Sequence, residues 1–338
     1  MAKIAVELLD DHVETDELAQ FIEKSSNGTL FHRPKFLTYH EKDKFPPDRF
    51  KVIHYVFRYD KRIIAFLPGM LVLNDHDQWE YKSPVGSSYG GFVIPPEITF
   101  VEAEEIVQLF INSIQEKTQS IEVGLTAFFY GCPNPEVINY FHYLLLKNGF
   151  HIEKSDLLLV YKTDTSRQIE KRFNRKTYGE LQQAFRYNLE KEISSIIDNE
   201  TYSLLLEARN RLGVLGIPPT HSFEDLQKIG ELFPENIKVF KARHDGILAA
   251  AIICFVVNKY VLNTFYIFDS LELRKYKPNH YNYYQVLKWA TENNYQYVDF
   301  GPSTMGYVPS YPLIFYKEKY DAKPFQRLTY KRESVEDK

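Results

Sequence analysis

Cysteine is scarce in this chain of 338 residues, which has only Cys132 and Cys254. Two distant thiols provide neither a disulfide framework nor the ligands of a structural zinc site. Both lie in or beside apolar runs that are typical of buried thiols. The ten histidines show no metal-binding spacing such as His-x-x-x-His. We therefore expect a reducing compartment and no metal site.

Long apolar runs and an excess of charge of one sign are also missing. No apolar run approaches the roughly eighteen residues of a membrane span, and the first residues, MAKIAVELLDDHVE, do not read as a signal peptide. The formal net charge is only -4, which argues against DNA or an anionic membrane as the main partner. The sequence predicts a cytoplasmic protein without a membrane span.

Aromatic residues, in contrast, are abundant, with 25 Tyr and 25 Phe. Their rings supply a large buried area, while Tyr hydroxyls need hydrogen-bond partners or water. An aromatic-lined and partly wet groove is therefore expected. The chain is longer than the usual size of one hydrophobic core, which makes two domains the default expectation.

Repeated elements indicate two similar halves. Predicted hairpins turn at Asp60-Lys61, between strands at 51–59 and 62–73, and at Asp245-Gly246, between strands at 237–244 and 247–257. The two turns lie 185 positions apart (245 − 60). An amphipathic helix, a strand, a further helix and a closing strand are predicted after each hairpin, and the closing strands fall near 157–161 and 325–330. The apolar stripes of the two helices are Ala103, Ile106, Val107, Phe110 and Ile114, and Tyr283, Val286, Leu287 and Ala290.

This order of elements predicts α/β units with mixed sheets flanked by helices. The expected domains are residues 1–165 and 166–332, followed by a frayed tail at 333–338. Residues 167–191, after the boundary, carry seven basic and three acidic side chains, a local charge of +4. Such a segment is commonly a solvated helix face, and binding of phosphates or RNA is the alternative.

A candidate site follows a predicted strand in the second half. β-forming residues flank Asp299, and Gly301 and Pro302 end the strand. Asp299 therefore lies at the carboxyl end of a strand, where α/β folds collect ligands. An aspartate there also commonly caps the loop, by bonding to Ser303 or to backbone amides. The two roles are compatible.

The loop at 83–91, which reads SPVGSSYGG, is the best candidate in the first half. Gly90 and Gly91 would let the backbone approach a ligand closely. Ser87 and Tyr89 supply hydroxyls without charge, as suits sugars or peptide amides. A tight turn at a strand end explains the glycines equally well.

Taken together, these features resemble the FemABX-like branch of the GNAT acyltransferases, over nearly the whole chain from Gly28 to Tyr330. The motifs that carry the resemblance are the repeated units, the loop at 83–91, Asp299-Phe300-Gly301-Pro302-Ser303 followed by Tyr316-Lys317, Leu30-Phe31-His32-Arg33-Pro34, Leu212-Gly213 with Gly216-Ile217-Pro218-Pro219, and Tyr276-Lys277-Pro278-Asn279.

The resemblance implies two tandem GNAT-like (acyl-CoA N-acyltransferase-like) domains, with the active site in the second. It also implies transfer of an acyl or aminoacyl group to an amine or hydroxyl of a cell-envelope or polysaccharide precursor. By motif match, Lys317 would stabilise the negative charge that develops on the carbonyl oxygen, and Asp299 is the second catalytic candidate. The expected substrate-binding residues are Ser87, Tyr89, Gly90, Asn279, Ser303 and Tyr316.

The chain departs from the family after Lys317. Relatives commonly have a glycine soon after this lysine, whereas this chain has Asp321. Glu318 and Asp321 could therefore pair with Lys317 and use its charge structurally.

A second departure concerns the acyl donor, which is either aminoacyl-tRNA or acyl-CoA. CoA-dependent relatives hold pyrophosphate on a glycine-containing loop before a helix, and here that place reads Arg274-Lys275-Tyr276-Lys277-Pro278-Asn279. We therefore expect weak CoA binding or none. The candidates for contact with donor phosphates are Arg172, Arg175, Arg274 and Lys275, although an ordinary solvated loop also explains the last two.

Two other function classes stay open. A CoA-dependent N-acetyltransferase of a sugar nucleotide or small amine would suit a chain that lacks the coiled-coil arm of some relatives. A binding module that kept the fold and lost the chemistry would explain Asp321 and the missing glycines. His221 and His280 could serve as a base, and a hydrogen-bonding role in a loop is the alternative.

Overall fold

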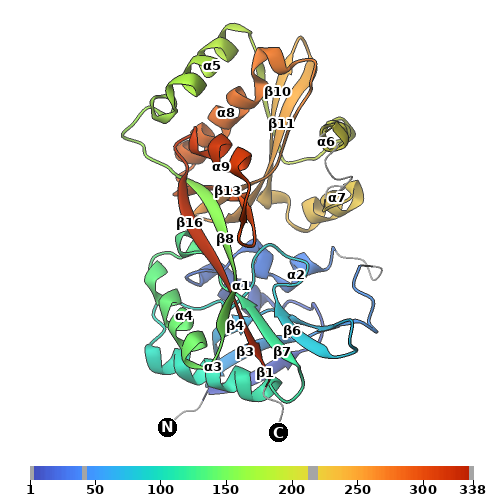
Figure 1. The fold of residues 1–338 in the computed structure, drawn as a ribbon, viewed down its shortest axis with the longest axis vertical. Helices are drawn as coiled ribbons and strands as arrows, with labels where there is room; N and C mark the ends of the chain where they lie inside the picture. The colour runs from blue at the N-terminus through green and yellow to red at the C-terminus, as the bar shows by residue number, and fades with distance from the viewer. Residues whose placement is uncertain (1–3, 40–43, 212–219, 335–338) are drawn as a thin grey trace. The chain divides into compact units, whose positions relative to one another are not determined.

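The computed structural model describes residues 4–39, 44–211 and 220–334, and its contacts divide the chain into two compact units (Figure 1). Unit 1 comprises Met1–Asp156 and Phe325–Lys338, and unit 2 comprises Leu157–Pro324. Each unit combines strands with packed helices, so the predicted class of two α/β units with helix-flanked mixed sheets is confirmed. The motif Leu212-Gly213 with Gly216-Ile217-Pro218-Pro219 lies outside the described residues.

Unit 1 has a three-stranded antiparallel sheet, in the order β1-β3-β4, and a second group of strands in the order β2-β5-β6-β7-β16. Within the second group, β6 and β7 run parallel. The apolar stripe predicted around Phe110 is buried on α3, which begins with a Thr99–Glu102 capping box. The elements are β1 (Ile4–Leu9), α1 (Asp16–Lys24), α2 (Pro34–Leu37), β2 (Phe50–Val52), β3 (His54–Tyr59), β4 (Arg62–Leu67), β5 (Met70–Leu73), β6 (Trp79–Ser83), α3 (Phe100–Ile114), β7 (Ser120–Gly124), α4 (Ile138–Lys147), the start of β8 (His151–Lys162) and β16 (Lys323–Glu333).

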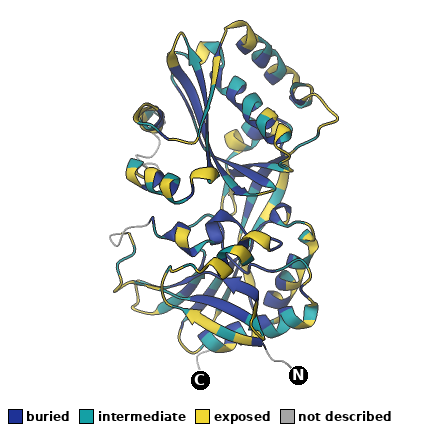
Figure 2. Ribbon diagram, turned by 180° about the vertical axis from the view of Figure 1, so that it is seen from behind, coloured by how far each residue is buried: buried dark blue, intermediate teal, exposed yellow. Residues whose placement is uncertain are grey.

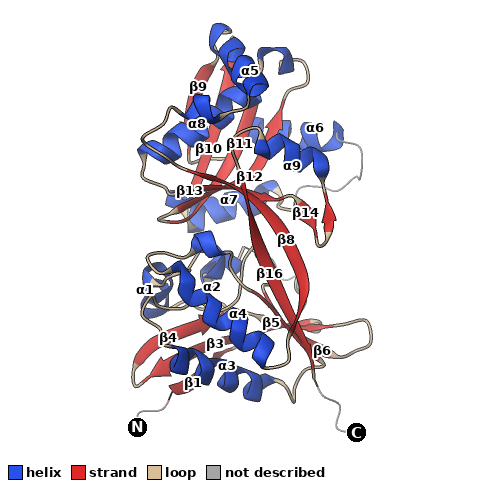
Figure 3. Ribbon diagram, turned by 60° about the vertical axis from the view of Figure 1, so that its left-hand side comes forward, coloured by secondary structure: helices blue, strands red, loops and turns tan. Residues whose placement is uncertain are grey.

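Unit 2 has the strand order β8-β13-β12-β11-β10-β9, in which β12 and β13 run parallel. Helix α8 covers one face with α5 packed against it, and α6 contacts the other face (Figures 1 and 3). Figure 2 shows the central strands buried between these layers. The elements are α5 (Arg175–Arg186), β9 (Glu190–Ser194), α6 (Asn199–Arg211), α7 (Phe223–Leu232), β10 (Ile237–His244), β11 (Ile247–Asn258), β12 (Val261–Asp269), α8 (Pro278–Glu292), β13 (Tyr297–Pro302), β14 (Thr304–Met305), β15 (Val308–Pro309) and α9 (Tyr311–Glu318).

The closing strands differ from the expected arrangement. We expected each half to keep its own closing strand, with the boundary between residues 165 and 166. In the structure, β8 crosses from unit 1 into unit 2 and pairs there with β13, while β16 pairs with β7 of unit 1. The sheet that each strand joins is set by contacts between distant segments, which no local pattern in the sequence records.

An arginine in the first predicted hairpin ties three elements together. The Nε of Arg58 on β3 lies 3.0 Å from Glu7 Oε2 on β1, and its Nη1 lies 2.8 Å from Glu17 Oε1 on α1. Nη1 also donates to the carbonyl of Lys61 in the turn, at 2.9 Å. The hairpin, the edge strand and the first helix are thus joined at one guanidinium.

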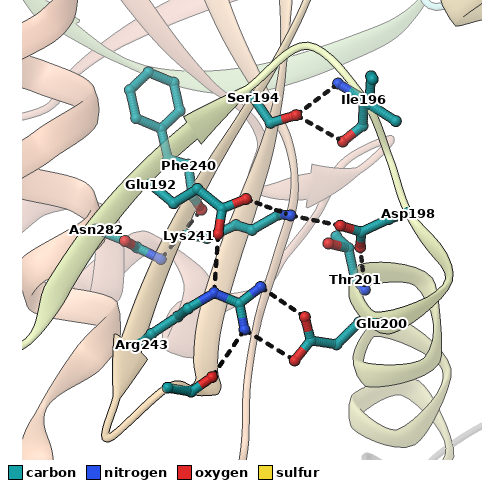
Figure 4. Close-up of polar contacts among 11 residues, drawn as sticks. Glu192, Ser194, Ile196, Asp198, Glu200, Thr201, Phe240, Lys241, Arg243 and Asn282 are labelled. Atoms are coloured by element: carbon teal, nitrogen blue, oxygen red, sulfur yellow. Dashed lines mark hydrogen bonds and ion pairs between the residues drawn. The ribbon is translucent and has the colours of Figure 1, made fainter.

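The second hairpin repeats this arrangement 185 positions later (Figure 4). The Nε of Arg243 on β10 lies 2.9 Å from Glu192 Oε2 on β9, and its Nη2 lies 2.6 Å from Glu200 Oε2 on α6. Nη1 donates to the carbonyl of Gly246 at 3.2 Å. In both hairpins the register shifts at the arginine, and the turn aspartate has a positive φ. The two units therefore share a detailed local design.

Unit 2 adds a buried lysine to its network. Lys241 is 1% exposed, and its Nζ lies 2.8 Å from Glu192 Oε1 and 2.6 Å from Asp198 Oδ2. Asp198 also accepts from the backbone N–H of Thr201 in the first turn of α6. Lys241 therefore anchors the start of α6 to the sheet.

Candidate active site

Strands β12 and β13 of unit 2 lie side by side at one end and separate at the other. Their parallel pairing covers 261–263 and 297–299. Beyond this point, β12 continues along β11 to Asp269, and β13 continues along β8 to Pro302. The carboxyl ends of two parallel strands thus diverge after Asn263 and Asp299, where α/β folds characteristically bind ligands.

Asp299 caps the turn at this divergence. Its side chain is fully buried; Oδ1 accepts from the N–H of Gly301 at 2.7 Å, and Oδ2 accepts from Asn263 Nδ2 at 3.2 Å. Gly301 has a φ of 75°, a left-handed conformation that suits glycine. The capping considered for Asp299 is therefore present. Its negative charge also acts on Lys317, whose pKa it raises.

Lys317, on α9, is a buried cation. It is 5% exposed, and its Nζ donates to the carbonyls of Gly301 at 2.9 Å and Pro302 at 2.8 Å and to Ser303 Oγ at 2.9 Å. These acceptors match the three protons of an ammonium group. Burial lowers the pKa of Lys317 to about 8, against the opposing effect of Asp299.

The hydroxyl of Ser303 is polarised by the ammonium group of Lys317. Its hydroxyl accepts a hydrogen bond from Lys317 and so keeps its own proton available for donation. A hydroxyl that accepts from an ammonium is a stronger donor, because such hydrogen bonds polarise one another. Ser303 is itself fixed, since its N–H donates to the carbonyl of Leu157 at 2.7 Å and its carbonyl accepts from Ser310.

Asp321 pairs with other partners than Lys317. Its carboxylate lies 2.9 Å from Arg172 Nε and 2.6 Å from Lys323 Nζ. Its φ is 65°, which is a left-handed conformation. Asp321 thus has a backbone conformation that glycine adopts without strain. The departure from the family leaves the three contacts of Lys317 intact.

Tyr316, the neighbour of Lys317, begins a chain of polar side chains. Its Oη lies 3.5 Å from Oη of Tyr320, which lies 2.7 Å from Nδ1 of His280. Nε2 of His280 lies 3.1 Å from Oε2 of Glu180 on α5. Burial raises the pKa of both tyrosines and lowers the pKa of His280 to about 4, so all three are neutral near pH 7.

Sequence reasoning missed Tyr320 and Glu180 and expected His280 in a loop. His280 instead lies in the first turn of α8 and is 9% exposed. The one local signal was the spacing of Tyr316 and Tyr320, which puts two rings on the same side of a helical segment. Glu180 lies 100 positions from His280, and no local pattern links them.

The start of α8 offers few bare amides. Pro278 has no N–H, and the N–H of His280 bonds to the carbonyl of Lys277 at 3.1 Å. Lys277 itself is in the left-handed conformation, with φ 60°. Asn279 lies here, half-buried, and its Oδ1 is buried without a hydrogen-bond partner among the described residues.

The four cations expected to meet donor phosphates have different surroundings. Arg274 is paired with Asp269 through two contacts of 2.8 Å. Arg172 donates to Asp321 and, at 2.7 Å, to Oη of Tyr161. Arg175 is exposed at the start of α5, and the Nζ of exposed Lys275 lies 5.0 Å from the ring centre of Tyr276. Arg172 and Arg274 thus already have anionic partners.

The expected residues of the loop at 83–91 lie together in unit 1. Tyr89 is 3% exposed and packs against Tyr130, with ring centres 4.7 Å apart. Ser87 Oγ donates to the carbonyl of Phe31 at 2.9 Å. A Cβ at Gly90 would lie 2.6 Å from the backbone nitrogen of Pro84. Close packing thus already accounts for Gly90 and for the burial of Tyr89.

A cavity of about 740 Å³ also lies in unit 1, lined by Leu8, His12, Phe45 and Met70 among others. None of the expected site residues lines it. Across residues 4–39, 44–211 and 220–334, no helix is both long and apolar enough to span a membrane. In these same ranges, no three His, Cys, Asp or Glu side chains gather as a metal site would require.

Comparison with known proteins bears on both units. Residues 203–308 match the family model of the acetyltransferase (GNAT) domain. The solved structure of FemX has a TM-score of 0.67 to this chain at 13% identity, with 96% of each chain covered. L-PGS from Bacillus licheniformis has a TM-score of 0.56 at 12% identity, covering 95% of this chain and 92% of its own.

A tandem GNAT protein from the clavulanic acid biosynthesis pathway has a TM-score of 0.51 at 12% identity, covering 99% of this chain and 100% of its own. No curated protein sequence matches the chain. At such identities the likeness to solved structures is one of fold. The resemblance indicated by the sequence motifs is confirmed at that level: residues 203–308 of unit 2 match the GNAT domain model, and over nearly its whole length the chain has the fold of FemX and of a tandem GNAT protein.

Proposed function

We propose that unit 2 transfers an aminoacyl group from aminoacyl-tRNA to an amine or hydroxyl of a cell-envelope precursor. The observation that carries this proposal is Lys317, a buried cation held against the loop at 301–303 where β12 and β13 diverge. The fold shared with FemX and with L-PGS supports the choice of reaction class. A further structure of similar fold is the C-terminal domain of a putative lysylphosphatidylglycerol synthetase from Agrobacterium fabrum, whose name combines lysine with a lipid.

The chemistry follows from where the charge lies. Attack on an ester carbonyl develops negative charge on its oxygen, and preorganised donors in a water-excluded site stabilise that charge strongly. In our proposal Ser303 donates to the oxygen, and Lys317 holds and polarises Ser303. Loss of one such donor typically lowers turnover about a hundredfold or more, equivalent to roughly 3 kcal/mol.

The helix start favours an aminoacyl-tRNA donor over CoA. Pro278 and the inward-bonded amide of His280 remove the row of bare N–H groups that would bind a pyrophosphate. Arg175 and Lys275 are exposed cations that suit a flexible polyanion. Aminoacyl-tRNA is a cytoplasmic molecule, and we propose the same location for this protein.

A transfer assay with defined donors and acceptors tests the proposal. The donors are bulk tRNA charged with labelled amino acids and, separately, labelled acetyl-CoA. The acceptors are a soluble nucleotide-linked peptidoglycan precursor, phosphatidylglycerol vesicles and glucosamine. We expect label to move from aminoacyl-tRNA to a cell-envelope acceptor. Transfer from acetyl-CoA instead would replace this proposal with the second candidate below.

The second candidate is a CoA-dependent N-acetyltransferase, which the match of residues 203–308 to the acetyltransferase (GNAT) model favours. Calorimetry with free CoA separates the two. Low-micromolar, saturable binding that survives Arg175→Glu and Lys275→Glu would support this candidate. Weak binding of CoA, together with tRNA binding that weakens steeply as salt rises, would support the aminoacyl-tRNA donor.

A further inference from the structure

A half-buried tyrosine, two buried side chains and one partly exposed carboxylate of unit 2 lie in a row, and the hydrogen bonds of the two buried side chains have a defined direction. Glu180 has a side chain that is 21% exposed, and it faces Nε2 of His280 at 3.1 Å. A carboxylate accepts only, so Nε2 of the neutral ring must carry the proton. Nδ1 is then an acceptor and takes the hydrogen bond of Tyr320, at 2.7 Å.

The contact between the two tyrosines is the long one of the chain. Tyr320 gives its proton to His280, so its oxygen is left as the acceptor toward Tyr316; the two oxygens lie 3.5 Å apart, longer than an ordinary hydrogen bond, and the relay requires this distance to shorten. The hydroxyl of Tyr316 also lies within the electrostatic influence of Asp269, the last residue of β12. The chain therefore leads from α9, where Tyr316 precedes Lys317, through buried Tyr320 and His280 to Glu180 on α5.

We propose that Tyr316, Tyr320, His280 and Glu180 form a proton relay that serves the transfer reaction. The relay rests on the proposed function, because it needs an acceptor whose nitrogen or oxygen must lose a proton. In this arrangement Tyr316 is the member that would contact the reactants. Tyr320, His280 and Glu180 act through it and are positioning residues, with Glu180 fixing the tautomer of the imidazole.

The proposed step balances within the site. The nitrogen or oxygen of the acceptor substrate forms a bond to the carbonyl carbon of the donor and loses its proton to Tyr316. Tyr316 at the same time gives its own proton to Tyr320, and Tyr320 gives its proton to Nδ1 of His280. The imidazolium is held by Glu180. The bond from the carbonyl carbon to the leaving oxygen or sulfur then breaks, and the proton returns along the same chain to that leaving atom.

Charged groups on three sides of His280 set how readily it accepts the proton. Glu180 favours the imidazolium, whereas Lys176 on α5, Lys277 before α8 and Lys319 after α9 disfavour it. Burial and these lysines together lower the pKa of His280 to about 4. An anionic donor lying near the three lysines would offset their charge and raise the pKa of His280 toward its ordinary value. The relay would then accept protons best when a donor is bound.

Tyr320→Phe tests the relay with a matched control. The substitution removes one hydroxyl and keeps the ring, which stacks on Tyr283 at 4.3 Å. With labelled aminoacyl-tRNA as donor, we expect kcat to fall about a hundredfold and KM to stay within about twofold. Tyr283→Phe removes a hydroxyl that is buried without a hydrogen-bond partner among the described residues, and it should leave kcat unchanged. Equal rates for the two variants would overturn the relay.

A second measurement does not depend on turnover. ¹⁵N NMR of the labelled histidines should show His280 as the Nε2–H tautomer in the wild-type protein and as a mixture of tautomers in Glu180→Leu, which removes the acceptor that fixes the proton on Nε2. An Nδ1–H tautomer in the wild-type protein would overturn the relay even if transfer is observed. Absence of transfer from every donor by a wild-type protein that has the expected tautomer would instead contradict the proposed function.

Discussion

At the scale of single residues, Lys317 is a buried cation whose protonated form is opposed by desolvation. Three oxygen acceptors and the charge of Asp299 favour its protonated form, while desolvation disfavours it and lowers its pKa to about 8. Sequence motifs identified both residues as candidates and put Asp299 at the end of a strand. They did not reveal that Lys317 donates a hydrogen bond to Ser303 Oγ, because hydrogen-bond partners are set by how α9 packs.

The shifted pKa predicts how activity depends on pH. Lys317 is an ammonium below about pH 8 and loses its charge above that value. Transfer should therefore fall as pH rises above about 8, in a single-turnover measurement. The folded pKa lies below the ordinary value of 10.5, so the same group makes the protein more stable as pH rises from 8 to 10.5.

Lys319 supplies the control, because burial also lowers its pKa to about 8. Lys319→Met should keep the loss of activity above pH 8, whatever its effect on the absolute rate. Disappearance of that loss in Lys319→Met would assign the titration to Lys319 and remove Lys317 from this account.

At the scale of elements, local patterns predicted the hairpins and helices well, and packing decided the rest. The hairpin around Asp245 and the buried stripe of α8 match the predicted segments closely. In unit 1 the long predicted strand 62–73 is interrupted by Pro68 and Gly69, which separate β4 from β5. The exchange of β8 and β16 and the divergence of β12 from β13 depend on contacts between distant segments, which no local pattern records.

The network around Lys241 should be the main anchor of α6. Lys241→Ala would leave Glu192 and Asp198 without their shared cation, and each of these carboxylates is partly exposed and regains some water. We expect the free energy of unfolding in urea to fall by roughly 2–3 kcal/mol, somewhat below the cost of breaking a fully buried pair. Lys191→Ala, at an exposed position on neighbouring β9, should change it by less than about 0.5 kcal/mol. An equal loss of the free energy of unfolding in the two variants would contradict the anchoring role of Lys241.

The same network predicts a loss of stability in acid. Burial acts to raise the pKa of Asp198, but hydrogen bonds from Lys241 and Thr201 outweigh it and lower the pKa to about 2. The stabilisation is fully present above about pH 4 and is lost as pH falls through 2. Thermal unfolding should therefore show a steeper decline between pH 4 and 2 for the wild-type protein than for Asp198→Asn. Parallel curves for the two proteins would contradict the assignment.

At the scale of the whole molecule, the two units are variations on one design. Arg58 with Glu7 and Glu17 in unit 1 corresponds to Arg243 with Glu192 and Glu200 in unit 2. Lys317, which contacts the loop at 301–303, belongs to unit 2, as does the chain from Tyr316 to Glu180. The repeated hairpins predicted the tandem fold from sequence, whereas the site that we propose lies in the second copy.

The most direct test of the central claim is the single-turnover rate of aminoacyl transfer by wild-type and Lys317→Met proteins at saturating aminoacyl-tRNA. Methionine keeps the approximate length of the side chain and removes its charge. We predict a rate about a hundredfold lower for the variant, with donor binding and the unfolding midpoint nearly unchanged. Equal rates for the two proteins would contradict the claim that Lys317 stabilises the charge that develops during transfer.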